Sequence, residues 1–239
     1  MRFGIAVFPG TWSDRDCKHA VELAGQDAVM LWHKDRDLRG ADCVILPGGF
    51  AYGDYLRAGA VARFAPLMES VIEFANNGGL VWGICNGFQI LAEAHLLPGA
   101  LTRNASLEYR CAATWLRVES TQTAYTSACE LGSVLQIPVS HGEGRYVADE
   151  ETLDELERNQ RVVFRYVARD GSLVGDASPN GSMRDIAGIV NERGNVLGMM
   201  PHPERACEEL LGSADGLRLF GSVAKTLAGN RVVPVAAVL

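Results

Sequence analysis

The sequence predicts an α/β fold, in which a doubly wound, mostly parallel central sheet carries helices on both faces and some antiparallel strands follow in the second half. In the first half, short apolar runs alternate with segments of helical periodicity, and strands that alternate with helices pair in parallel. Two predicted strands end in glycine-rich turns, at residues 47–49 and 83–85. Ligands of such sheets bind beyond the carboxyl ends of the strands, so these turns locate the expected site.

Each element of the first half is predicted from its apolar spacing and its stop signal. Short apolar runs bounded by Pro or Gly are typical of buried strands, whereas apolar residues three or four positions apart are typical of helices. In chain order, these rules give a strand over residues 3–8, a helix over 14–24 that stops at Gly25, a strand over 41–49 that ends in a glycine pair, a helix over 61–75, a strand over 80–84 and a helix that begins near Asn86.

The second half is less regular, and we expect shorter strands there, some of them antiparallel. An apolar run, a turn at residues 192–195 and a second apolar run predict a hairpin. The remaining predictions are strands within residues 113–120, 132–148 and 160–182 and a closing amphipathic helix over 213–229. The apolar tail, residues 232–239, is compatible with packing, pairing with a partner or disorder, and these alternatives stay open.

Composition and charge limit the classes of function. The chain has 239 residues, of which 48% are hydrophobic and 21% charged, and without a repeat or low-complexity linker it is expected to form one domain, 1–239. A formal net charge of −7 argues against binding nucleic acid or an anionic membrane surface. The N-terminus is typical of a strand, not of a signal peptide, and no apolar window is long enough for a membrane span. Six cysteines without a CxxC pair predict reduced thiols, a cytoplasmic protein and no thiolate metal site.

The segment GICNG, residues 83–87, fits a nucleophile elbow with cysteine in the place of serine. A strand that turns sharply into a helix strains the residue at the turn, and glycine two positions away on each side avoids a clash. Cys85 would then lie at a helix N-terminus, where the dipole and free N–H groups favour a thiolate. The Asn86 N–H could donate to an oxyanion. The alternative is a small buried cysteine in a glycine-rich turn.

A second signal is the late segment HPE. The residue before proline is biased toward an extended conformation, in which alternate side chains project together. His202 and Glu204 are therefore predicted to pair, with the carboxylate orienting the imidazole. A thiol, a base and an acid form the triad of nucleophilic catalysis. Taken alone, such a segment would more often be a solvated loop.

Gly48 and Gly49 follow a strand predicted to neighbour the elbow strand, and a glycine pair there can aim N–H groups at a developing oxyanion. The alternative is an ordinary strand-to-helix turn. Gln89, one helical turn after Cys85, could reach over the mouth of a pocket, although a lone polar residue would more often be exposed.

Together, the elbow, Gln89, the upstream Pro-Gly-Gly and the late His-Pro-Glu resemble the class I, or triad, glutamine amidotransferases. Further segments match in order over nearly the whole chain and resemble the family of free-standing glutaminase subunits of phosphoribosylformylglycinamidine synthase, in purine biosynthesis. The more particular of them are GGFAYGDYLRAG, HGEGRY, PNGS and GMMPHPER. This family typically has Ser-Asn-Cys-Asp where this chain has Thr11-Trp12-Ser13-Asp14, and Asn at the position of Ser178.

The resemblance implies that glutamine is hydrolysed to glutamate and ammonia through a γ-glutamyl thioester on Cys85. It assigns the triad to Cys85, His202 and Glu204, the oxyanion contacts to Gly48 or Gly49 and Asn86, and a glutamine contact to Gln89. A synthetase subunit would hold ATP and Mg and convert formylglycinamide ribonucleotide to formylglycinamidine ribonucleotide, beside a small third subunit. This chain itself is expected to carry no cofactor.

HGEGRY and PNGS have no evident part in amide hydrolysis, so we expect them to lie toward the pocket rim and the contact with the synthetase. An Arg145 charge reversal that leaves the complex intact would contradict this.

Two other classes of function remain. A cysteine hydrolase or peptidase-like protein would share the elbow but not glutamine selectivity. A non-catalytic interaction module would be expected to have lost Cys85, His202 or Glu204, and all three remain.

Overall fold

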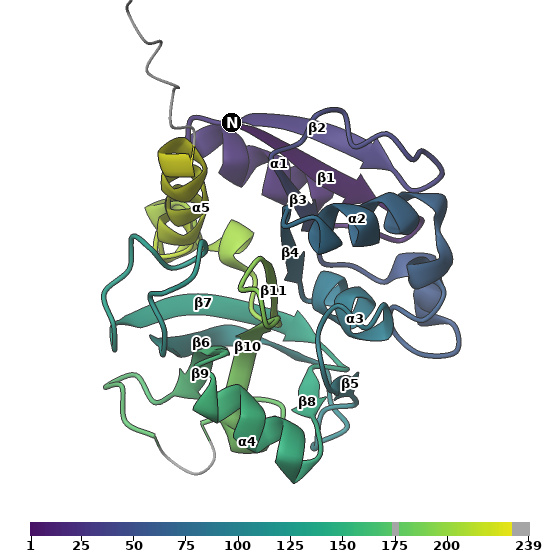
Figure 1. The fold of residues 1–239 in the computed structure, drawn as a ribbon. Coiled ribbons are helices and arrows are strands. Elements are labelled where there is room, and N and C mark those ends of the chain that lie inside the picture. The colour runs from purple at the N-terminus through teal and green to yellow at the C-terminus, as the bar shows by residue number, and fades with distance from the viewer. Residues whose placement is uncertain (174–176, 231–239) are drawn as a thin grey trace, which may run out of the picture.

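The computed structural model describes residues 1–173 and 177–230 (Figure 1). Within them, one nine-stranded sheet has the order β2-β1-β3-β4-β11-β10-β9-β6-β7, and β5 pairs with β8 separately. The first-half elements are β1 (Arg2–Val7), α1 (Asp14–Leu23), β2 (Asp27–Trp32), β3 (Cys43–Leu46), α2 (Pro66–Asn76), β4 (Leu80–Ile84) and α3 (Asn86–Glu93). The others are β5 (Ala100–Thr102), β6 (Arg110–Val118), β7 (Val134–His141), β8 (Arg145–Val147), α4 (Glu150–Arg158), β9 (Val162–Val167), β10 (Ile186–Val190), β11 (Val196–Met199) and α5 (Leu217–Asn230).

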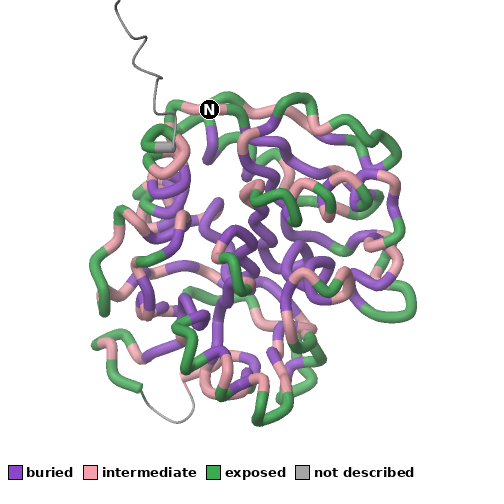
Figure 2. Tube along the Cα trace, viewed as in Figure 1, coloured by how far each residue is buried: buried purple, intermediate pink, exposed green. Residues whose placement is uncertain are grey.

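The sheet changes character along its width. From β2 to β11 neighbouring strands run parallel, and from β11 to β7 they run antiparallel. The predicted mixture of parallel and antiparallel strands, with the hairpin β10–β11, is therefore confirmed. The strand β3, CVIL, in the middle of the parallel half, is buried at every position, as a strand with helices on both faces requires (Figure 2).

Helices cover both faces of the parallel half (Figure 1). On β4, the Trp82 ring packs 4.8 Å from the Phe220 ring of α5, measured between centroids. The next residue, Gly83, faces the opposite helix, because a Cβ there would lie 2.5 Å from Leu91 Cδ1 of α3. Successive residues of a strand point to opposite faces, so α5 and α3 lie on opposite sides of the sheet.

One predicted helix is shorter than expected. The helix assigned to residues 61–75 is a short 3₁₀ turn, Ala62–Phe64, followed by α2, which begins at Pro66. Ala65 is extended, with ψ of 144°, because the following proline disfavours the helical conformation at that residue. The strand β2 and the helix α4 were not predicted. The tail at 232–239 lies outside the described residues.

Candidate active site

Cys85 sits at the junction of β4 and α3 with φ of +51° and ψ of −106°. This is a strained backbone for a residue with a Cβ, as the elbow predicts. A Cβ on Gly83 would lie 2.7 Å from the Gly87 backbone, and a Cβ on Gly87 would collide with the Leu46 carbonyl oxygen of β3. The two glycines thus let α3 approach both strands closely enough to present the thiol at the sheet edge.

The turn after β11 supplies the second group. His202 Nδ1 lies 2.6 Å from Glu204 Oε1, and both side chains are fully buried. The segment is a 3₁₀ turn, Pro203–Arg205, and not the extended segment that the sequence predicted, because proline fixes a φ suited to the first residue of a turn. The predicted pairing of the two side chains is present, but a tight turn produces it.

His202 faces Cys85 with its other nitrogen. Burial lowers the pKa of His202, but the charges of Glu204 and Cys85 outweigh burial and raise that pKa well above its ordinary value. Nε2 has no hydrogen-bond partner of good geometry among the described residues, although the Cys85 side chain is close enough to affect the titration of the ring. A buried imidazolium beside Cys85 and the N-terminus of α3 both stabilise an anionic sulfur.

Cys85 opens into a cavity of about 200 Å³. That volume lies below the ~300–1,000 Å³ of sites for drug-sized ligands, so the cavity suits a molecule of amino-acid size. Its lining comes from the glycine turn after β3, from α3 and from the end of β7: Gly49, Phe50, Asp54, Cys85, Gln89, Tyr109, Ser140, His141, Gly142 and Glu143.

The two predicted oxyanion glycines have different surroundings. Gly49 lines the cavity, whereas Gly48 packs beneath the imidazole, where a Cβ would lie 2.5 Å from His202 Cε1. The Gly48 carbonyl accepts hydrogen bonds from the Trp12 and Ser13 N–H groups. Asn86, the first residue of α3, carries an N–H without an acceptor in the helix. Gly49 and Asn86 therefore fit the oxyanion role by position, and Gly48 fits a packing role.

The side chains of Asn86 and Gln89 hydrogen-bond to each other beside the cavity. Asn86 is 1% exposed; its Nδ2 donates to Gln89 Oε1 at 2.9 Å, and its Oδ1 accepts from the Ala51 N–H at 3.0 Å. Gln89 Nε2 donates to the Glu143 carbonyl at 2.6 Å. Gln89 is thus buried at the cavity and not exposed, and it links α3 to the loop that contains HGEGRY.

The HGEGRY and PNGS segments meet in one buried network. Asn180 Nδ2 donates to the Gly144 carbonyl at 2.8 Å and lies 3.4 Å from His141 Nε2. Asn104 Oδ1 lies 3.2 Å from the other ring nitrogen of His141. Burial, with a smaller effect of the His202 charge, lowers the pKa of His141 to about 4, so this ring is neutral at neutral pH. The residues of HGEGRY form part of the cavity wall; their predicted contact with a synthetase stays a prediction.

Sequence reasoning missed Asp54, Tyr109 and Ser140 as cavity residues, whereas HGEGRY, expected toward the pocket rim, contributes His141, Gly142 and Glu143 to the lining. The three missed residues belong to loops or strand ends with no periodic signal, so only the folded chain brings them to Cys85. The Cys85 Sγ lies 3.7 Å from the Ser140 carbonyl oxygen, and the Ser140 Oγ lies 2.9 Å from the Tyr109 hydroxyl. Asp54 lies in the segment GGFAYGDYLRAG and Ser140 directly precedes HGEGRY, but neither segment assigned these two residues to the cavity.

Trp12, where the chain departs from the family pattern, lies over Arg205. The guanidinium carbon is 4.1 Å from the indole centroid, and Arg205 Nε is 4.0 Å from Glu204 Oε1. Arg205 Nη2 also donates to Ser13 Oγ at 3.4 Å, and its Nε lies 3.7 Å from Asp16 Oδ2. Trp12 therefore contacts Arg205, the residue that follows Glu204.

A larger groove, about 620 Å³, lies between α1 and β2, with a lining that includes Arg15, Lys18 and Trp32. It contains no nucleophile beside a base, so the smaller cavity at Cys85 is the better candidate for chemistry.

Among residues 1–173 and 177–230, no group of three His, Cys, Asp or Glu side chains is arranged to hold a metal ion. No helix in the described part of the chain has the length and apolar content to cross a membrane.

Comparison with known proteins identifies the family of the chain. The family model described as a CobB/CobQ-like glutamine amidotransferase domain matches residues 1–216. The phosphoribosylformylglycinamidine synthase subunit PurQ of Moorella thermoacetica is 56% identical over 224 residues, which cover 93% of this chain and 95% of that protein. The subunit of the same name from Streptomyces avermitilis is 57% identical over 228 residues, covering 95% and 97%.

Among solved structures, a chain of the PurLQS structure from Thermotoga maritima is 44% identical with a TM-score of 0.83, covering 95% of this chain and 98% of that one. The glutaminase domain of Trypanosoma brucei CTPS, at 12% identity and a TM-score of 0.62, shares the fold. The chain therefore belongs to the glutamine amidotransferase family, among the PurQ-type glutaminase subunits of phosphoribosylformylglycinamidine synthase.

Proposed function

We propose that this chain hydrolyses the side-chain amide of glutamine with Cys85 as nucleophile, His202 as base and acid, and Glu204 as the group that orients and charges the imidazole. The observation that carries the proposal is the strained Cys85 at the start of α3 beside the fully buried His202–Glu204 pair, whose Nδ1 and Oε1 atoms are 2.6 Å apart. A thiol, a base and an acid placed this way form the arrangement of covalent amide hydrolysis.

In the first half-reaction, the Cys85 sulfur attacks the amide carbon, and the carbonyl oxygen takes up the negative charge. The N–H groups of Gly49 and Asn86 would donate to that oxygen. His202 then passes its proton to the amide nitrogen, the carbon–nitrogen bond breaks, and ammonia leaves a γ-glutamyl thioester on Cys85. The raised pKa of His202 keeps this proton available at neutral pH.

In the second half-reaction, His202 takes a proton from water, which attacks the thioester carbon. The carbon–sulfur bond breaks, glutamate leaves, and the sulfur and imidazole return to their starting states. Glu204 is not protonated in either step; its charge stabilises the imidazolium. A cavity of about 200 Å³ suits a free amino acid, whereas a peptidase would require a groove for an extended chain.

We infer that the ammonia serves a synthetase partner. The relatives from Moorella and Streptomyces are named as subunits of phosphoribosylformylglycinamidine synthase, and the related Thermotoga structure is named PurLQS. By this likeness, the partner would carry ATP, Mg²⁺ and formylglycinamide ribonucleotide, a small third subunit would complete the complex, and the pathway would be cytoplasmic purine synthesis. Nothing in the proposed chemistry of this chain requires a cofactor.

The proposal is tested by mass spectrometry after treatment with a diazo-ketone analogue of glutamine. We expect modification at Cys85 alone, and we expect excess glutamine to prevent it. The matched comparison is the buried thiol Cys17, whose pKa burial raises well above its ordinary value and which should stay unmodified. Iodoacetamide serves as a general thiol control in the same samples.

Two results would contradict the proposal. A Cys85 that reacts with iodoacetamide but not with the analogue, even with the synthetase subunits and nucleotide present, would leave the cavity without glutamine selectivity and favour a different cysteine hydrolase. Hydrolysis of glutamine that persists in a Cys85→Ala variant would remove the nucleophile from the mechanism.

A further inference from the structure

Residues 10–13, which lie between β1 and α1, pack directly against the glycine turn after β3. Thr11 and Gly49 form an antiparallel bridge, and the Phe50 N–H donates to the Gly10 carbonyl at 2.9 Å. The fit is close, because a Cβ on Gly49 would lie 2.7 Å from the Thr11 Cα. A shift of residues 10–13 would therefore move the turn that contains one of the two predicted oxyanion donors.

The same pairing sets the direction of the Gly49 N–H. The Gly48 carbonyl accepts hydrogen bonds from the Trp12 and Ser13 N–H groups, each at 3.2 Å. That carbonyl and the Gly49 N–H belong to one planar trans peptide unit, so they point in opposite directions. Because Gly49 lines the cavity, a carbonyl held toward residues 10–13 leaves the N–H on the cavity side.

The Trp12 side chain connects this segment to both turns of the site. Its ring stacks with the Phe50 ring, with 6.3 Å between centroids and 30° between planes. The Arg205 guanidinium carbon lies 4.1 Å from the indole centroid. Phe50 directly follows Gly49, and Arg205 directly follows the triad acid. The indole thus contacts the oxyanion turn and the turn that contains Glu204.

Arg205 gives the ring a fixed support. Its backbone N–H donates to the His202 carbonyl at 3.1 Å, and its Nη2 donates to Ser13 Oγ at 3.4 Å. Its Nε lies 3.7 Å from Asp16 Oδ2. A planar guanidinium stacks on aromatic faces, and one already held by other partners loses little further freedom in doing so. The contact therefore holds the indole in place although Trp12 is 47% exposed.

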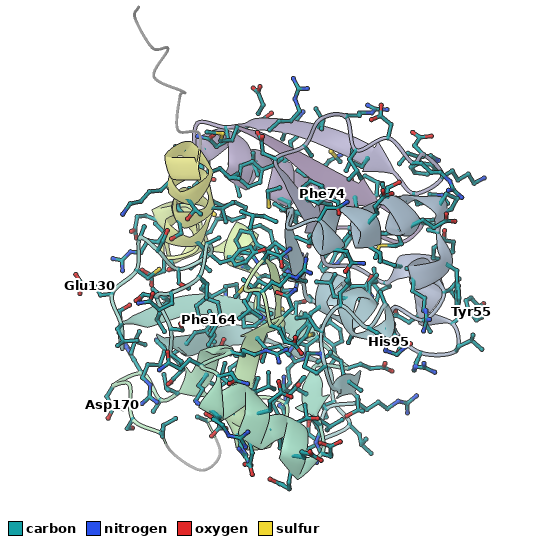
Figure 3. The ribbon with its side chains drawn as sticks, in the orientation of Figure 1. Tyr55, Phe74, His95, Glu130, Phe164 and Asp170 are labelled. Atoms are coloured by element: carbon teal, nitrogen blue, oxygen red, sulfur yellow. The ribbon has the colours of Figure 1, made fainter. Side chains whose placement is uncertain are left out.

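The contact belongs to the part of the loop after β3 that contains Gly49. Tyr55, later in this loop, is 75% exposed and lies at the edge of the molecule (Figure 3). Phe50 is only 42% exposed, with its ring against Trp12. Among these two aromatic side chains, the one that Trp12 contacts is thus the one next to the oxyanion donor.

We propose that Trp12 is a positioning residue for amide hydrolysis, whose ring holds residues 10–13 in place so that the Gly49 N–H faces the developing oxyanion. This role rests on the proposed glutaminase function and adds a residue to it. Trp12 lies outside the cavity lining, so it acts through Gly49 and not on the substrate. Donors aimed at an oxyanion act mainly in the transition state, so poorer positioning lowers kcat and leaves KM nearly unchanged.

The test compares Trp12→Ala and Trp12→Phe in the chain assembled with a saturating amount of its synthetase partner. Alanine keeps the backbone N–H and removes the ring, whereas phenylalanine keeps a ring over Arg205. For Trp12→Ala we expect kcat for glutamine hydrolysis to fall about tenfold, with KM within about twofold of the wild-type value. For Trp12→Phe we expect kcat to stay within about threefold of the wild-type value. A Trp12→Phe kcat as low as that of Trp12→Ala would overturn the role of the ring.

A second readout separates the oxyanion donor from the triad. Iodoacetamide alkylates Cys85 by displacement of iodide at a saturated carbon, so no oxyanion forms and the rate depends on the thiolate. We expect the alkylation rate of Trp12→Ala to stay within about twofold of the wild-type rate. A rate that falls as far as kcat would assign the effect to the thiolate and overturn the proposal.

Trp32→Ala is the matched control, because Trp32 is 46% exposed and its ring packs on His33, with 4.5 Å between centroids, on the edge strand β2. Glu130→Gln is a second control, since Glu130 is an exposed carboxylate that points outward at the side of the molecule opposite Tyr55 (Figure 3). Both variants should keep the wild-type kcat. If Trp12→Ala does not fold, Trp12→Leu takes its place, since leucine keeps an apolar side chain without a planar ring.

The outcomes also separate this role from the function on which it rests. A wild-type complex that does not hydrolyse glutamine contradicts the glutaminase function itself. A wild-type complex that hydrolyses glutamine, together with a folded Trp12→Ala variant of equal kcat, contradicts the positioning role alone. The role is also overturned if Trp32→Ala lowers kcat as far as Trp12→Ala does.

Discussion

At the scale of single residues, Glu204 contributes charge more than hydrogen-bonding geometry. Its Oε1 lies 2.6 Å from His202 Nδ1, while its Oε2 is buried without a hydrogen-bond partner among the described residues. A carboxylate in that position makes the imidazolium the stable form of His202. An amide of the same shape would keep an acceptor beside Nδ1 but lose the charge.

We therefore expect Glu204→Gln to lower glutaminase kcat about 100-fold or more, because His202 would no longer hold its proton near neutral pH. The alkylation rate of Cys85 at pH 7 should fall as well, since the imidazolium that stabilises the thiolate is lost. Glu208→Gln is the control: its carboxylate pairs with His19, at 2.8 Å, on the exposed surface. Retention of more than half of the wild-type kcat would contradict the assigned role.

Trp12 is a second residue whose effect can be measured directly. Its indole covers the Arg205 guanidinium at 4.1 Å and is 47% exposed, conditions in which a cation–π contact contributes about 0.5–1 kcal/mol. We expect Trp12→Ala to lower the free energy of unfolding by about 1 kcal/mol and Trp12→Phe to lower it less. Chemical denaturation of the two variants checks this order. Equal losses in both would show that a phenyl ring does not replace the indole over Arg205 and would contradict this account of the contact.

At the scale of elements, the sequence predicts those parts whose periodicity reflects burial. The fully buried β3 and the hairpin β10–β11 were recognisable as apolar runs with clear ends. The edge strand β2 was missed because its residues are mostly half-buried or exposed, with Trp32 46% exposed. The helix α4 was missed because only Leu153 and Leu156 mark its buried face among six charged residues.

The site follows the same rule. The sequence indicated Cys85, His202 and Glu204 because each lies in a local pattern that chemistry explains, and the structure brings them together. Asp54 and Glu143 lie in the segments GGFAYGDYLRAG and HGEGRY, but no local chemistry assigned them a role: one sits in a turn with φ of +55° and the other in the loop between β7 and β8. Their significance depends on a shared cavity, which is a long-range property of the fold.

The contact between α3 and β3 gives a sharp test of the elbow. A Cβ on Gly87 would collide with the Leu46 carbonyl, a backbone atom that cannot rotate away. We expect Gly87→Ala to cost about 3 kcal/mol or more, as overpacking of a tight contact does, and to abolish glutamine-protected labelling of Cys85. Gly221→Ala in α5 is the matched control, since nothing lies within 4 Å of its added methyl group and alanine favours a helix interior. A Gly87→Ala variant as stable as the wild type would contradict this close approach of helix and strand.

At the scale of the whole molecule, the site lies where the parallel and antiparallel halves of the sheet meet. The parallel strand β4 leads to Cys85, and its neighbour β11, the last strand of the parallel series, leads to His202. The antiparallel strand β7 ends at His141, beside the cavity, and its Pro138 carbonyl accepts a hydrogen bond from the His202 N–H at 2.8 Å. Cys85 and His202 thus keep their relative positions only while both halves of the sheet are folded. We therefore expect loss of activity and global unfolding to coincide.

The same junction makes the stability of the whole molecule depend on pH through Asp54. The groups that face it are Glu143, which adds repulsion, and the Asn86 amide, which donates to it at 3.5 Å. Its pKa is about 6 in the folded chain against an ordinary value of 3.8. Because the folded pKa is the higher one, the stabilising contribution is complete below pH 3.8 and is lost as the pH rises through 6.

Asp54→Asn should remove that pH-dependent loss. Since Asp54 is half exposed, we allow for solvent screening and expect a gain of about 1 kcal/mol at pH 7.5, or roughly 2–4 °C in Tm, relative to the gain at pH 4.5. Asparagine also tolerates the left-handed backbone at this position, so part of the stabilisation will be the same at every pH. Only the increase between pH 4.5 and pH 7.5 reports the charge, and Glu130→Gln should show no such increase. If the Asp54→Asn gain is equal at both pH values, the carboxylate is fully solvated and the repulsion from Glu143 is absent.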